Sequence, residues 1–187
     1  MQTKIHTTNF GEAEYPHLSK PDTKFNPDGV YKVKLKVSKQ DAEKDIKIIN
    51  DVIALEKAEE YKRNPKNGKP IMKTAPLPYE YDDEGNVVLT FKMRAKGINS
   101  KTKQPFEQKP KIVDHNMDDL PEDKIIWGGS ILRVNYQPVG YNVASTGIGC
   151  TLRLKGVQVK KLIEGTSMAT QGFSKVEADE FESRLPK

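Results

Sequence analysis

The chain has 187 residues, of which 35% are hydrophobic and 30% charged, and its formal net charge is +5. This size allows one domain with a modest core and a tail, and no apolar run reaches the roughly 20 residues that cross a bilayer, which argues against a membrane-spanning helix. The single cysteine, Cys150, excludes an internal disulfide and favours a reducing compartment, whereas the basic balance favours an anionic partner such as nucleic acid or a membrane surface.

The N-terminal region begins without an apolar signal core, which predicts a cytosolic protein. Residues 3–11 predict a weak strand that ends at Gly11, and the proline-rich stretch at 14–29 (EYPHLSKPDTKFNPDG) predicts a long ordered loop. Residues 28–38 (DGVYKVKLKVS) then alternate between apolar and basic side chains. This period of two predicts a half-buried strand with Lys32, Lys34 and Lys36 on its solvent face.

Residues 38–65 predict one long amphipathic helix. Ser38 and Asp41 form a variant of the capping box, and Asn64-Pro65 ends the helix because a residue before proline avoids the helical region. The predicted apolar stripe comprises Ala42, Ile46, Ile49 and Ile53, widened by Ile48, Val52 and Leu55.

The middle of the chain returns to loops and strands. Residues 65–80 predict a Lys/Pro-rich loop, and residues 82–86 (DDEGN) predict a turn. Residues 87–97 (VVLTFKMRAKG) alternate again, which places Lys92, Arg94 and Lys96 on a polar strand face. A flexible basic loop is predicted at 98–108.

The last third predicts a short strand at 109–116, an acidic connector at 117–123, and two longer strands. In residues 125–142 (IIWGGSILRVNYQPVGYN) the solvent face includes Arg133, and in residues 150–162 (CTLRLKGVQVKKL) it includes Arg153 and Lys155. The alternation slips across Gly156, which predicts a β-bulge there.

Five or six strands, one long helix and no βαβ rhythm favour a mainly β fold, a small antiparallel barrel or sandwich. We expect one domain over residues 1–164 and a flexible tail over residues 165–187, because the tail shows no period.

The basic rows on three strands can be ordinary solvated lysines or a wall that binds nucleic acid. Acidic residues are concentrated elsewhere, in the helix, in DDEGN and in MDDLPED, and this segregation favours nucleic acid. Among the aromatic residues, Tyr136 is expected in the core. Trp127, just before Gly128-Gly129, can be a core residue or an exposed stacking platform, and the core is favoured. Tyr141 is expected in a loop beyond the strand, where it can stack on a base.

Signals for catalysis are weak. The three histidines His6, His17 and His115 are scattered, with no pair at the spacing of metal ligands. The acidic cluster Asp114, Asp118 and Asp119 is expected to be a solvated loop, and it leaves open a small metal-dependent nuclease as one alternative. An RNA-binding OB-fold protein is another alternative. No enzyme activity, cofactor or metal is expected.

The chain resembles the single-stranded DNA-binding proteins of T-odd podovirus replication systems. The resemblance rests on an ordered set of segments: NFGEAEYPHLSKPD, GVYKVKLKVS, TFKMRAK with SKTKQ after it, and IIWGGSILRVNYQPVGYN with CTLRLKGVQVKKL. It implies an OB-fold barrel with a long inserted helix. It also implies sequence-independent binding of single-stranded DNA in phage replication and recombination, with protection and annealing of strands.

The same resemblance implies a homodimer that works with the phage DNA polymerase and helicase-primase in the cytoplasm of the infected bacterial host. The family's loop tyrosine falls on Tyr141, and Val143 stands about where the family has a tryptophan. Family tails are strongly acidic, whereas residues 165–187 hold four acidic and three basic side chains. The DNA-binding residues expected from the rows and from the family are Lys32, Lys34, Lys36, Lys92, Arg94, Lys96, Arg133, Tyr141, Arg153 and Lys155.

Overall fold

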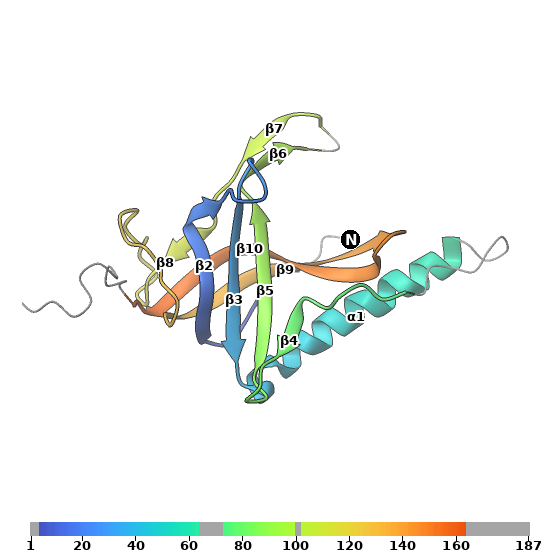
Figure 1. Ribbon diagram of the computed structural model, residues 1–187, viewed down its shortest axis with the longest axis horizontal. Coiled ribbons are helices and arrows are strands. Elements are labelled where there is room, and N and C mark those ends of the chain that lie inside the picture. Colours follow the sequence, from blue (N-terminus) through green and yellow to red (C-terminus); the bar gives the residue numbers. More distant parts are fainter. Residues whose placement is uncertain (1–3, 64–72, 100–101, 164–187) are drawn as a thin grey trace, which may run out of the picture.

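The computed structural model describes residues 4–63, 73–99 and 102–163. Within them, the chain forms ten strands and one helix (Figure 1). In chain order these are β1 (His6–Thr7), β2 (Gly11–Asp22), β3 (Val30–Val37), α1 (Lys39–Arg63), β4 (Tyr79–Tyr81), β5 (Val87–Arg94), β6 (Lys96–Ile98), β7 (Pro105–Glu107), β8 (Lys111–Val113), β9 (Ile131–Val143) and β10 (Gly147–Lys161).

Five of these strands close into a barrel. The main sheet runs β1-β9-β2-β3-β5-β10-β8, and β9 also pairs with β10, so the path β2-β3-β5-β10-β9 returns to β2. All pairings along this closed path are antiparallel except β5 with β10, which is parallel; β8, outside the path, also pairs with β10 in parallel. A five-stranded barrel of this kind is the OB architecture, and it confirms the predicted mainly β barrel with an inserted helix.

Apolar side chains from the inward faces of the strands fill the barrel interior. Tyr31, Val33, Leu35 and Val37 of β3 are buried, and Phe91 of β5 lies opposite Val33. The solvent sides of the same strands carry the basic residues, because neighbouring residues of a strand point to opposite faces.

Helix α1 confirms the predicted long helix and its N-terminal cap. The backbone N–H of Asp41 donates to the Ser38 hydroxyl oxygen at 3.1 Å. Ala42, Ile49 and Ile53 are buried as predicted, but Leu55 is 51% exposed, so the buried stripe is narrower than expected. The helix lies against β9 and β10 at one end of the barrel, away from the β6–β7 hairpin (Figure 1).

Two polar contacts fasten this helix to β9. The Tyr136 hydroxyl donates to the buried carboxylate of Asp45 at 2.5 Å. Near the other end of the helix, the side-chain amide of Asn142 donates to Glu60 at 2.6 Å.

The prediction of a loop over residues 14–29 is wrong for its first nine residues, which belong to β2. The register of β2 against β3 shifts between Glu14 and His17 and again between His17 and Asp22. Pro16 and Pro21 fall inside these two irregular steps, where a missing N–H interrupts no ladder hydrogen bond. The basic segment 98–108 is likewise not all loop, because β6 and β7 pair as a short hairpin.

Three finer predictions have different outcomes. The bulge at Gly156 is confirmed, because the register of β10 against β9 shifts between Leu154 and Gly156. Tyr136 is buried as predicted, but the prediction that Trp127 is core is wrong, since 48% of its surface is exposed. Tyr141 lies within β9 and not in a loop, because β9 continues to Val143.

The expected tail at 165–187 lies outside the described residues. Residues 65–72 of the expected Lys/Pro-rich loop also lie outside them. Among the described residues, no helix is long and apolar enough to cross a membrane.

Candidate nucleic-acid interface

The registers of three adjacent strands bring basic residues from distant parts of the sequence into one row. Lys32 of β3 pairs with Lys92 of β5, and Lys92 pairs with Arg153 of β10. His17 of β2 continues the row beyond Lys32. Because adjacent strands lie about 4.8 Å apart, this transverse row (His17, Lys32, Lys92 and Arg153) crosses four strands on the outer face of the barrel.

The three lysines of β3 are each paired with carboxylates from neighbouring elements. Lys32 contacts Asp22 of β2 at 2.5 Å, and Lys34 contacts Glu80 of β4 at 2.5 Å. The Lys36 ammonium contacts Asp82 and Glu84 in the turn before β5, both at 3.0 Å. The acidic DDEGN turn, which the sequence separates from the lysine strand, therefore lies next to it in space.

These contacts change the ionisation of the groups involved. Hydrogen bonds to Asp82 and Glu84 raise the pKa of Lys36 well above its usual value. Burial acts to raise the pKa of Asp82, but hydrogen bonds from Asn86 and Lys36 outweigh it and hold that pKa at about 2. The β3 lysines thus act first as partners of these carboxylates, and their net attraction for an anion is reduced.

Five of the predicted cations make no ion pair among the described residues, and four of these five lie on one pair of strands; the fifth is Arg133 of β9. The four are Lys92, Arg94, Arg153 and Lys155. All four belong to β5 and β10, the parallel pair, and all but the half-buried Lys155 are exposed. We call these residues the open cations, and they are the strongest phosphate-binding candidates on this face.

Two other predicted residues lie apart from the transverse row. Lys96 belongs to the β6–β7 hairpin, where it contacts Glu107 at 3.3 Å. Arg133 of β9 donates to the side-chain oxygen of Gln158 at 2.8 Å, and its guanidinium lies 5.0 Å from the ring centroid of Phe10. The structure therefore does not bring Lys96 or Arg133 together with the open cations.

A groove of about 450 Å³ adjoins the row on the outer face of β3 and β5. Two tyrosines line it, Tyr15 from β2 and Tyr79 from β4, and Lys92 lies among its lining residues. Tyr15 is 75% exposed and has a positive φ of 47°, a conformation that a residue with a side chain rarely adopts. The remaining lining residues are Lys32, Val33, Lys34, Leu77, Glu80 and Thr90.

Tyr141 lies on the outer face of β9, opposite Gly149 of β10. Its ring covers that glycine, because a Cβ placed on Gly149 would lie 2.6 Å from Tyr141 Cζ. Gly149 is therefore needed to leave room for the ring. Tyr141 is partly buried, with one side against Gly149, so it is a positioned aromatic and not a loose loop side chain.

The acidic cluster at 114–119 is used within its own turn. The Asp114 carboxylate accepts backbone N–H groups of Asn116 at 2.8 Å and Asp118 at 3.0 Å, and Asp119 pairs with Lys111. Among the described residues, no group of three or more histidine, cysteine or acidic side chains can hold a metal ion. These contacts do not favour the nuclease alternative.

Sequence reasoning missed Tyr15, Tyr79 and the carboxylates that pair with the β3 lysines. Tyr15 was hidden because two prolines made its strand resemble a loop. The contact between Lys36 and the acidic turn could have been predicted from the sequence. Antiparallel pairing of residues 30–37 with 87–94 puts Val37 beside Val87, which directly follows that turn.

Comparisons with known proteins give a consistent result. A family model described as "Single-stranded DNA-binding protein, Bacteriophage T7" matches residues 10–162. The single-stranded DNA-binding proteins of Enterobacteria phage T3 and Escherichia phage T7 are each 34% identical to the chain, over 174 and 176 residues. These matches cover 81% and 83% of the chain and 72% and 74% of the two relatives.

Solved structures are also similar. The crystal structure of gp2.5, a single-stranded DNA-binding protein encoded by bacteriophage T7, has a TM-score of 0.72 at 27% identity, covering 99% of this chain and 96% of that one. The single-stranded DNA-binding protein from bacteriophage Enc34 in complex with ssDNA has a TM-score of 0.60 at 19% identity, covering 87% and 89%. The second similarity shows a shared fold.

Proposed function

Because the chain belongs to the family of the bacteriophage T7 single-stranded DNA-binding protein, we infer that it binds single-stranded DNA without reading its sequence. The observation that carries this function is the cross-strand pairing of two open cations, Lys92 and Arg153, beside an aromatic groove on the outer face of the barrel.

The chemistry of this face suits an unpaired strand. The open cations neutralise phosphates, which attracts any nucleic acid regardless of sequence. Tyr15, Tyr79 and Tyr141 offer aromatic rings for bases, and only an unpaired base has a free face to stack on such a ring. In OB folds the outer face of the second and third barrel strands, here β3 and β5, is the usual oligonucleotide surface.

A titration at two salt concentrations tests this function. Fluorescently labelled poly-dT and a duplex of the same length are each titrated with the protein, and we expect much tighter binding of poly-dT with an affinity that falls as salt rises. An unlabelled RNA oligonucleotide serves as competitor. Equal binding of duplex and single strand, or stronger binding of RNA, would contradict the proposed specificity.

Matched variants locate the binding surface. Arg153→Gln and Lys92→Gln remove open cations, whereas Lys111→Gln removes an exposed lysine that pairs with Asp119 outside the face. We expect the first two to weaken poly-dT binding and the third to leave it nearly unchanged. Normal binding by both open-cation variants would place the DNA on another surface.

The family resemblance extends the proposal to the wider role of the protein. We propose that it is a non-enzymatic homodimer that coats and protects single strands, assists annealing in phage replication and recombination, and works with the phage polymerase and helicase-primase in the host cytoplasm. Sedimentation equilibrium tests the dimer, because a mass near 21.1 kDa over the whole concentration range would exclude it. Incubation of DNA with protein and Mg²⁺ tests the absence of nuclease activity.

A further inference from the structure

A second and larger hollow, of about 670 Å³, lies beside β2. It is lined by residues 12–20 of β2 and by residues 125–129, which lead into β9. Two backbone hydrogen bonds hold this second segment against β2: Gly129 N–H donates to Ala13 O at 2.9 Å, and Ala13 N–H donates to Ser130 O at 2.8 Å. Backbone pairing at its C-terminal end therefore attaches this segment to β2.

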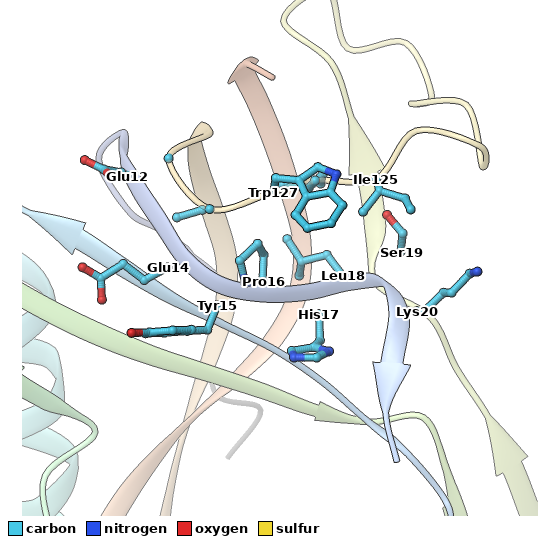
Figure 2. A pocket seen from close by; sticks show the side chains of 14 residues that line it. Glu12, Glu14, Tyr15, Pro16, His17, Leu18, Ser19, Lys20, Ile125 and Trp127 are labelled. Carbon is cyan, nitrogen blue, oxygen red and sulfur yellow. The ribbon is translucent and has the colours of Figure 1, made fainter. Parts of the chain in front are cut away.

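Exposed apolar side chains form the rim of this hollow. Trp127 is 48% exposed and Ile125 is 45% exposed. Figure 2 shows the indole of Trp127 beside Pro16 and Leu18, with Ile125 next to it. A large aromatic ring that is half in solvent contributes less to the core than it would if buried, and such rings mark surfaces that bind a ligand.

Charge is unevenly distributed around the hollow. Glu12 and Glu14 lie at one end, and Ser19 and Lys20 lie at the other, beyond Trp127 (Figure 2). Among the described residues, Lys20 makes no ion pair. An anionic chain that entered the hollow would therefore keep its charges away from the two carboxylates and toward Lys20.

The hollow and the proposed DNA surface adjoin each other at β2. Tyr15 lines both this hollow and the groove on β3 and β5. His17, which also lines the hollow, is the cross-strand neighbour of Lys32 in the transverse row. The positive φ of Tyr15 belongs to the irregular step of β2, and such strained backbone persists where it positions a functional side chain.

We propose that single-stranded DNA continues from the transverse row across β2 and stacks an unpaired base on Trp127, with Tyr15 as the bridge between the two hollows. This assignment rests on the proposed function and extends it to a second base-binding site. The apolar rim accepts the face of a base, and the neighbouring phosphate lies toward Lys20. His17, on the other side of the β2 ribbon from Trp127 (Figure 2), faces the part of the DNA strand that has not yet crossed β2. Trp127 then contacts only those single strands that are long enough to occupy the transverse row as well.

The single tryptophan of the chain makes the test direct, because all tryptophan fluorescence comes from Trp127. Oligo-dT strands of about 4 to about 16 nucleotides, the range of site sizes for one OB fold, are titrated against the full chain, and fluorescence anisotropy of a labelled strand reports total binding. We expect binding of a strand of any length to raise the anisotropy of its label. Only the longer strands should quench the fluorescence of Trp127.

Affinity measurements on variants complete the test. Trp127→Ala is expected to weaken binding of the 16-nucleotide strand about 5- to 160-fold, the range for one stacked base, and to leave the shortest binding strand unaffected. Trp127→Phe should restore most of the loss. Leu55→Ala removes an exposed apolar side chain of α1 and serves as the matched control, with melting curves for every variant.

The outcomes separate this inference from the proposed function. Normal anisotropy binding by the wild type, with no quenching at any length and full affinity in Trp127→Ala, overturns the Trp127 site and leaves the proposed function standing. Lower melting temperature with unchanged affinity also overturns it, since Trp127 would then be structural. Quenching by an apolar peptide but not by oligo-dT would assign the hollow to a protein partner instead.

Discussion

At the scale of single residues, the packing of the Tyr141 ring over Gly149 predicts that both residues affect binding of single strands. We expect Tyr141→Ala to cost about 1–3 kcal/mol in binding of single strands, because one stacked base is lost, while duplex affinity hardly changes. Gly149→Ala should have a similar effect with the ring still present, because a Cβ there would lie 2.5 Å from the Tyr141 hydroxyl oxygen. Both affinities and the melting temperature are measured on each variant. Loss of stability with an unchanged preference for single strands would show that Tyr141 only packs.

The contrast between paired and open cations gives a second prediction at this scale. Arg153→Gln should reduce the magnitude of the salt slope of poly-dT binding by about 0.7, the value for one phosphate of a single strand. Lys36→Gln should leave the slope nearly unchanged, because Lys36 is engaged with Asp82 and Glu84. Equal changes in the two variants would mean that DNA displaces those carboxylates.

At the scale of elements, the turn between β4 and β5 predicts a pH effect. The pKa of Asp82 is about 2 in the folded protein, below its ordinary value of 3.8. The charged carboxylate therefore stabilises the fold above about pH 4, and this contribution is lost as the pH falls through about 2. Asp82→Asn should lower the melting temperature at neutral pH, and the difference from the wild type should shrink between pH 4 and pH 2. A constant difference across that range would show that the amide's altered hydrogen bonding matters more than the charge.

Elements also differ in how well the sequence predicted them. The alternation in β3, the stripe of α1 and the slip at Gly156 each arise from the local period of the chain, so their buried faces and the bulge could be predicted. Strand β2 could not, because its prolines indicate a loop unless the two register shifts that accommodate them are known. Periodicity describes one strand at a time, whereas β2 depends on its partner.

The candidate site was also predictable only in part, because periodicity does not show which strands lie side by side. The polar faces of the strands were correctly assigned, but the ion pairs of the β3 lysines join residues 10 to 48 positions apart, and only the sheet register brings them together. For Trp127 the sequence leaves two placements open, the core and an exposed stacking platform, and the favoured core placement is wrong. In the structure Ile126 is buried, and Trp127, the next residue, lies at the surface.

At the scale of the whole molecule, the number of open cations predicts the ionic-strength dependence of binding. If Lys92, Arg94, Arg153 and Lys155 each neutralise one phosphate, log affinity for poly-dT should fall against log salt with a slope of about −3, since each phosphate of a single strand contributes about −0.7. Binding isotherms at four or more salt concentrations measure the slope. A slope near zero would remove the electrostatic basis of the interface, and one of about −5 would add the three β3 lysines to it.

The closure of the barrel has a consequence for synthesis. Strand β10 pairs with β5, β8 and β9, and it supplies Arg153 and Lys155 to the basic face. While residue 161 is still inside the ribosome, the edge of β5 that pairs with β10 is therefore free. The basic face then lacks Arg153 and Lys155. Contacts between segments so distant in sequence form late and slowly, so the complete basic face appears only after β10 has been made and has paired. Until then β5 alone supplies open cations, so the nascent chain is less able to capture the transcript from which it is being made.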